Sequence, residues 1–69
     1  MRIGDAIVWN GTGEAKINAW RAKRNIVAGT VGIVVNSMTS HGLTELYVMM
    51  NGRLEYFQAP EVEVISESR

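Results

Sequence analysis

The 69-residue sequence predicts a single, mainly β domain of five short strands, with a short helix inserted between the first two strands. Short runs rich in β-branched and aromatic residues alternate with turn signals, which is typical of a small all-β domain. The pair Asn51-Gly52 is the strongest short-range signal for a β-hairpin. Between the first two of these runs, the segment 14–25 contains neither glycine nor proline and is rich in helix formers.

The strands are separated by residues that favour turns. We expect strands over 3–9, 27–38, 45–50, 53–58 and 62–65. Turns are expected at 10–13, at 40–42 and at the hairpin 51–52, and 59–61 is expected to form one turn of 3₁₀ helix. Gly29 and Gly32 interrupt the second strand, where glycine usually marks a bulge, a sharp bend or a close backbone contact.

The segment 14–25 is expected to form a helix of one to three turns. Ile17, Trp20 and Arg24 recur at helical spacing, so they give the helix one partly apolar face. Thr12 is placed to cap the start of this helix, and the basic residues near its end suit the negative end of the helix dipole. A long, curled hairpin arm is the alternative for the same segment.

A chain of this length buries only about 60% of the surface that it exposes when unfolded, so it can form one small core. The whole chain 1–69 is expected to form that domain, with an insert over 10–28 and a flexible tail over 66–69. The alternation of apolar residues predicts the following core: Ile3, Val8, Val31, Ile33, Val35, Leu46, Val48, Met50, Leu54, Phe57, Val62 and Val64.

The order of the expected elements resembles the SH3-like small β-barrel over nearly the whole chain. The shared features are five short strands, a long first loop, a tight hairpin and a 3₁₀ turn before the last strand. Gly29, Gly32 and Val34 in AGTVGIV are similar to the glycine-rich motif of KOW-type domains in ribosomal and transcription-elongation proteins. The layout is also similar to short proteins of tailed phages, including cyanophages, and to the small barrel subunit of photosystem I. The resemblance implies a five-stranded barrel, but this fold hosts many unrelated functions.

The net charge is zero, but the charges are unevenly distributed. Residues 1–24 hold five basic and two acidic residues, a balance of +3, and residues 45–69 hold two basic and five acidic residues, a balance of −3. Such asymmetry predicts a surface with two poles of opposite charge. A dedicated nucleic-acid-binding domain is usually basic overall, and this chain is not.

A basic cluster within the insert is the first candidate binding site. It consists of Lys16, Trp20, Arg21, Lys23 and Arg24. Tryptophan and arginine are typical hot-spot residues of protein interfaces, so the cluster fits an acidic protein surface. The same residues fit phosphates and a stacked base of a nucleic acid. In a third interpretation, Trp20 and Ile17 pack the insert against the barrel while the charges only face solvent.

The hairpin strands supply a second candidate site. If Leu46, Val48 and Met50 point inward, then Tyr47 and Met49 face outward, where they would form an apolar patch suited to another subunit. Alternatively, Trp20 and the insert cover this patch within the monomer. Trp9 is expected to close one end of the barrel, and a binding platform is the alternative for it.

The sequence carries no recognisable catalytic or metal-binding motif. There is no cysteine, and the single histidine, His41, lies between Ser40 and Gly42 like a turn residue. Glu61, Glu63 and Glu67 are expected to face solvent. We therefore expect no enzymatic activity, cofactor, metal or small-molecule substrate.

The leading hypothesis is a small assembly module that docks on a larger protein or on itself, as an accessory or virion-associated phage protein. Nucleic-acid binding through the basic insert is the alternative. No stretch is long enough to span a membrane, and no signal peptide is recognisable, so we expect no membrane association and a cytoplasmic location, in the host cell or the virion.

Overall fold

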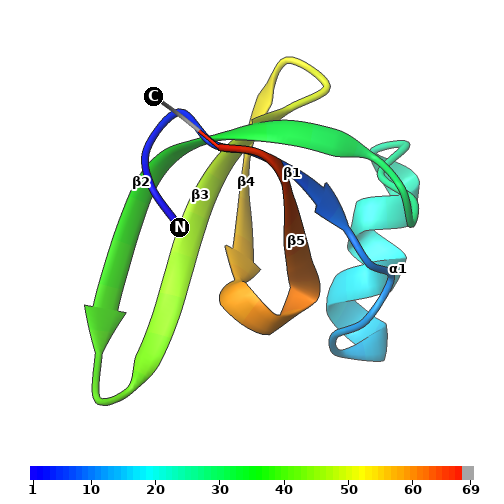
Figure 1. The fold of residues 1–69 in the computed structure, drawn as a ribbon. Helices are drawn as coiled ribbons and strands as arrows, with labels where there is room; N and C mark the ends of the chain where they lie inside the picture. Colours follow the sequence, from blue (N-terminus) through cyan, green and yellow to red (C-terminus); the bar gives the residue numbers. More distant parts are fainter. Residues whose placement is uncertain (68–69) are drawn as a thin grey trace.

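In the computed structural model, residues 1–67 are described, and they form five strands, one α-helix and one 3₁₀ helix (Figure 1). The first half of the chain contains β1 (Ala6–Trp9), α1 (Ala15–Lys23) and β2 (Val31–Ser40). The second half contains β3 (Leu43–Met50), β4 (Arg53–Gln58), η1 (Ala59–Glu61) and β5 (Val62–Ser66). The expected mainly β class, the five strands and the helical insert are therefore confirmed.

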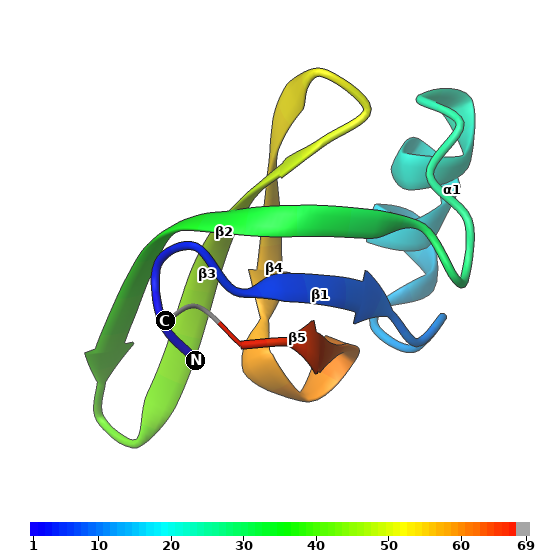
Figure 2. The same ribbon diagram turned by 45° about the horizontal axis from the view of Figure 1, so that its top comes forward.

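All strands belong to one antiparallel sheet in the order β4-β3-β2-β1-β5. The long strand β2 bends, so that its first residues pair with β1 and the rest pairs with β3 (Figure 2). The register shifts between Val34 and Asn36, as expected where an extra residue increases the bend. Within residues 1–67, β4 and β5 do not pair, so the sheet is curved but is not closed into a barrel.

Several element boundaries differ from the expectation: β1 begins at Ala6 instead of residue 3, β2 extends to Ser40 instead of residue 38, and β3 begins at Leu43 instead of residue 45. Two further differences have local reasons. The helix begins after Glu14 and has no side-chain cap, so the expected cap at Thr12 is wrong. The Thr12 hydroxyl donates to the side-chain oxygen of Asn10 instead. Strand β2 begins at Val31 because a tight turn precedes it, in which the Thr30 hydroxyl bonds to both backbone groups of Val27. The 3₁₀ turn and the Asn51-Gly52 hairpin lie where the sequence places them.

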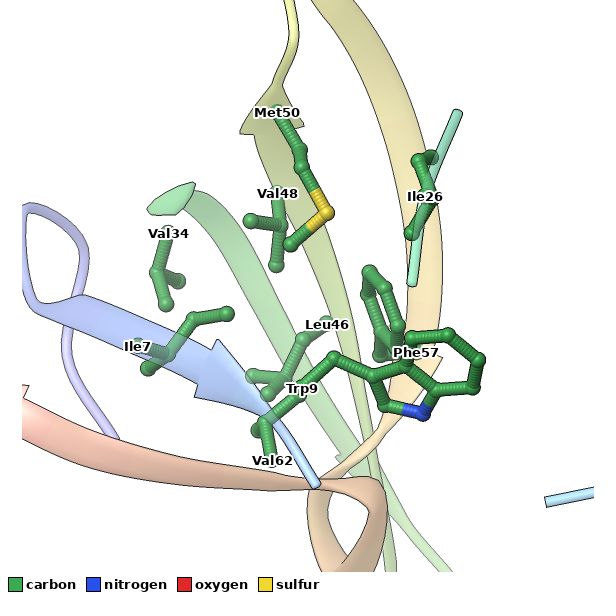
Figure 3. Close-up of a cluster of buried hydrophobic side chains, with 9 residues drawn as sticks. All are labelled: Ile7, Trp9, Ile26, Val34, Leu46, Val48, Met50, Phe57 and Val62. Carbon is green, nitrogen blue, oxygen red and sulfur yellow. The ribbon is translucent and has the colours of Figure 1, made fainter. Parts of the chain in front are cut away.

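The inner face of the curved sheet holds the core (Figure 3). The buried apolar residues are Ile7, Trp9, Ile26, Val34, Leu46, Val48, Met50, Phe57 and Val62. Trp9 packs in this core at 6.3 Å from the ring of Phe57, so it is buried and does not form an exposed binding platform.

The predicted core is correct for Leu46, Val48, Met50, Phe57 and Val62 and wrong for the other positions. The exposed ones are Ile3, Val31, Ile33, Val35, Leu54 and Val64, and Val8 is half-buried. In β1 and β2 the alternation is inverted, because a shift of one residue exchanges the two faces of a strand. Gly32 takes an inward position, so its β-branched neighbours point outward.

The inward position of Gly32 has a steric cause. A Cβ atom at this residue would lie 2.5 Å from Val48 Cγ1 and 2.8 Å from the backbone oxygen of Met49. Only glycine fits at such a distance, so Gly32 allows β2 to approach β3 closely. Of the tail expected over 66–69, Ser66 ends β5, whereas residues 68 and 69 lie outside the described part of the chain.

Two neighbouring valines test this inverted alternation. Val34 is fully buried and Val35 is 39% exposed. We expect Val34→Ala to lower the free energy of unfolding by about 2 kcal/mol, because it removes two buried methyl groups and leaves a cavity. The matched substitution Val35→Ala should cost less than about 1 kcal/mol. Urea denaturation measures both values, and a larger loss at Val35 would contradict the assigned faces.

Candidate docking surface

The C-terminal end of the helix α1 is fixed by backbone and side-chain contacts. Arg21 and Lys23 lie in its last turn, where cations interact favourably with the helix dipole. The helix ends because Asn25 adopts a left-handed backbone conformation, with φ at 60°. The Ile26 N–H then bonds to the Arg21 carbonyl oxygen at 2.9 Å, and the Ile26 side chain enters the core. The short insert thus has a fixed end.

Arg21 is the most important anchor of α1, and its side chain is only 1% exposed. Its guanidinium group donates to Glu61 Oε2 at 2.6 Å and to the backbone oxygen of Tyr56 at 2.8 Å. It also donates to the Asn18 side chain at 3.1 Å. The guanidinium carbon lies 4.1 Å from the centroid of the Phe57 ring, in cation–π geometry. One side chain therefore ties α1 to the edge strand β4 and to η1.

A second ion pair also holds the C-terminal end of the helix. Arg24 makes two hydrogen bonds with the Glu55 carboxylate, at 2.7 and 3.1 Å, and Glu55 is buried. The Asn51 side chain donates to the Asn25 carbonyl oxygen at 3.2 Å. The end of α1 therefore lies beside the start of β4, while Arg21, one turn earlier in the helix, reaches Tyr56, farther along β4. The helix thus runs antiparallel to β4 (Figure 1), and the Arg21 and Arg24 side chains connect it to this edge strand.

The outer face of the sheet is also apolar, and we call it the outer apolar face. It comprises Ile33, Tyr47, Met49, Leu54 and Tyr56 of the sheet, together with Trp20 of α1. Met49 lies directly opposite both Ile33 and Leu54 in the register, so these three residues form a row across β2, β3 and β4. The rings of Tyr47 and Tyr56 pack edge to face at 5.8 Å.

A groove between α1 and β4 extends this face toward the helix. Ile17 and Trp20 line the groove on the helix side, and Leu54 and Tyr56 line it on the strand side. Arg53 and the Arg24–Glu55 ion pair lie at the same groove, so charged groups border its apolar residues. Trp20 is 66% exposed and Leu54 is 57% exposed, which leaves both side chains available for contact.

The structure divides the sequence-predicted site residues into three groups. Lys16, Trp20 and Lys23 are exposed on α1, and Arg24 is partly exposed in its ion pair. Tyr47 and Met49 lie on the outer face of β3, as expected. Arg21 is separate from both groups because it is buried and paired with Glu61, so its surface is occupied within the fold.

Two of the alternative interpretations are wrong. Trp20 and Ile17 do not pin the insert to the sheet, because they are 66% and 41% exposed while Arg21 is buried in their place. The insert does not cover the hairpin patch either, because Met49 remains 43% exposed.

Sequence reasoning assigned Leu54 and Ile33 to the core, so it missed their place on the outer apolar face. The signal was available for Leu54, since Leu54 and Phe57 are three residues apart and cannot share one face of a regular strand. No comparable signal marked the partners of Arg21, because Glu61 is distant in sequence and no local pattern joins the two residues.

We also searched the described residues for a metal site and for a membrane-spanning helix. Among residues 1–67, no group of three or more His, Cys, Asp or Glu residues is arranged to hold a metal ion. His41 is exposed at the turn between β2 and β3, where its φ is 52°. No helix of this described part is both long and apolar enough to cross a membrane. The chain matches no protein-family model, no curated protein and no solved structure.

The anchoring role of Arg21 has a direct test. We expect Arg21→Met to lower the free energy of unfolding by about 3 kcal/mol or more, because it removes the arginine donor from Glu61 Oε2 and from the Tyr56 carbonyl oxygen. The same substitution at exposed Lys23 should change stability by less than about 0.5 kcal/mol. The double variant Arg21→Met/Glu61→Gln should recover part of the loss. Equal effects at positions 21 and 23, measured by denaturation, would contradict this role.

Proposed function

We propose that this protein is a non-catalytic binding and assembly module, which docks on a larger protein or on another copy of itself through the outer apolar face. The continuity of this face carries the proposal. Ile33, Met49 and Leu54 form one row in the register, and Leu54 continues into the groove beside Trp20. Large contiguous apolar patches on small domains mark interaction sites, whereas scattered apolar residues do not.

The way in which Trp20 is held supports a binding role. The ion pairs of Arg21 and Arg24 fix the helix that carries it, so little conformational freedom is lost when a partner covers the ring. Tryptophan is the residue type most enriched among interface hot spots. Lys16, Lys23 and Arg53 lie around this region and favour a partner with acidic groups, whose orientation they would set.

The finer fold assignment, an SH3-like small barrel with a KOW-like glycine motif, belongs to the same proposal. It is supported by the order of elements, by the inward Gly32 and by the position of α1. Arg21 joins α1 both to β4 and to Glu61, the residue before β5, so the helix bridges the two unpaired edges of the sheet. The proposal includes an accessory or virion-associated role, in the host cytoplasm or the virion. Its only support is the resemblance of the sequence to tailed-phage proteins.

Site-specific photo-crosslinking tests the docking role. A photo-crosslinking phenylalanine analogue is introduced at position 49 or 54 of the outer apolar face and irradiated in the native host. We expect protein adducts from both positions, because each side chain would be covered by the partner. Their mass reports whether the partner is a second copy or another protein.

Positions 27 and 65 are the matched controls, since Val27 and Ile65 are 60% and 55% exposed but lie outside the outer apolar face. They should give few adducts. Equal yields from all four positions, or none from positions 49 and 54, would overturn the docking role.

Nucleic-acid binding is a second candidate, which one observation favours. Lys16 and Lys23 lie four residues before and three residues after Trp20, so they share its side of the helix. An exposed indole between two ammonium groups could stack on a base while the lysines contact phosphates. The neutral net charge and the apolar sheet residues favour the protein-docking role instead.

Fluorescence anisotropy with mixed-sequence single- and double-stranded oligonucleotides separates the two candidates. Under the docking proposal we expect no binding at physiological salt. Micromolar affinity that falls steeply with salt and drops roughly tenfold or more in Trp20→Ala would place nucleic acid first. Lys16→Gln should then reduce the salt dependence.

A further inference from the structure

Two adjacent methionines of β3 lie on opposite faces of the sheet. Met50 is 1% exposed, and Figure 3 shows its sulfur among the core side chains. Met49 is 43% exposed and belongs to the outer apolar face. The chain contains four methionines and no cysteine, so thioethers are its only sulfur groups. An oxidant in solution therefore has access to one sulfur of this pair and not to the other.

We propose that Met49 is an oxidation site, at which a peroxide converts the thioether to a sulfoxide and so prevents docking through the outer apolar face. We call this change the methionine switch. It rests on the docking function proposed above and names a way in which that function is regulated. The oxidant it takes is a two-electron oxidant of the peroxide class.

The oxidation needs no group of the protein besides the thioether. A lone pair of the Met49 sulfur attacks one oxygen of the peroxide, so an S–O bond forms while the O–O bond breaks. The sulfur loses two electrons and the peroxide gains them. The proton of the attacked oxygen moves to the leaving oxygen, which departs as water when the oxidant is hydrogen peroxide. Sulfoxide reductases reverse the change, so the docking face is restored.

The position of Met49 in the register connects its oxidation to docking. Met49 lies opposite Ile33 of β2 and opposite Leu54 of β4, so it is the middle residue of the apolar row. A sulfoxide oxygen accepts hydrogen bonds, and the side chains of isoleucine and leucine have no donor to offer. A partner that covers the row would bury this oxygen without a hydrogen bond, which is costly. In the free chain the oxygen faces water, so the fold does not pay this cost.

The other exposed methionines lie away from the row. Met1 is 42% exposed and Met38 is 50% exposed, so a peroxide reaches them as well. Met38 lies opposite Glu45, toward the turn between β2 and β3, and Met1 precedes β1. Of the four methionines, Met49 alone combines exposure with a place in the row. Oxidation elsewhere therefore serves as an internal control.

Peptide mapping by tandem mass spectrometry tests the oxidation site. The purified full chain is treated with limiting hydrogen peroxide, and fragment ions separate Met49 from Met50. We expect Met49 to be oxidised roughly tenfold faster or more in the folded chain, because exposure governs the rate, and both residues to react alike in urea. Circular dichroism should show that the oxidised chain remains folded. Equal rates at the two residues in the folded chain would overturn the oxidation site.

Photo-crosslinking from position 54 in the native host tests the methionine switch. The adduct yield of each chain is compared before and after a brief pulse of hydrogen peroxide. With native Met49 we expect the pulse to lower the yield roughly fivefold or more, because the sulfoxide would be buried without a donor. In Met49→Leu the pulse should leave the yield at that variant's own starting value. Met38→Leu is the matched control, in which the pulse should still lower the yield.

The outcomes separate this inference from the docking function on which it rests. Adducts that persist undiminished after the pulse with native Met49 would overturn the methionine switch and still support docking. A pulse that lowers the yield equally in Met49→Leu would also overturn the switch, because the effect would then arise at another group. The absence of adducts before any pulse would overturn the docking function, and the switch with it.

Discussion

The guanidinium group of Arg21 is the contact on which the arrangement of this protein depends. It binds the Glu61 carboxylate and the Tyr56 carbonyl oxygen, and it lies against the faces of Phe57 and Trp9. A nine-residue helix is too short to be stable alone in water, so α1 needs such tertiary contacts. A buried charge is costly unless it is fully paired, and the Arg21 contacts meet that condition with partners from α1, β4 and η1.

This anchor has a consequence for the surface. An ordinary amphipathic helix packs its apolar stripe against the core and leaves its charges in water. In α1 the charged Arg21 supplies the inward contact, so Trp20 and Ile17 remain on the outside, beside Leu54 and Tyr56. The same ion pair that stabilises the insert therefore produces the exposed apolar groove. Stability and the proposed binding role are linked through one residue.

Sequence patterns predicted the elements of this fold more accurately than the faces of its strands. Turn residues such as Asn51-Gly52 act locally, so the number and order of elements follow from them. The faces depend on distant packing: glycine fits the inward position 32 because Val48 and the Met49 backbone oxygen leave no room for a Cβ atom there. Likewise, the basic residues of the predicted site looked equivalent in sequence. Arg21 differs from Lys23 in being buried and paired, because Glu61 lies next to it in space.

An apolar outer face is a hazard unless the edges of the sheet are protected, because open edges invite uncontrolled strand pairing. Here Arg21 of α1 donates to the Tyr56 carbonyl oxygen of the edge strand β4. The other edge, β5, carries exposed Glu63, and its pairing with β1 contains an irregularity near Ala6 and Ile7. Charges and irregular pairing both discourage the addition of further strands. The row of Ile33, Met49 and Leu54 lies on one face of the sheet, which favours the proposed docking contact over edge-to-edge aggregation.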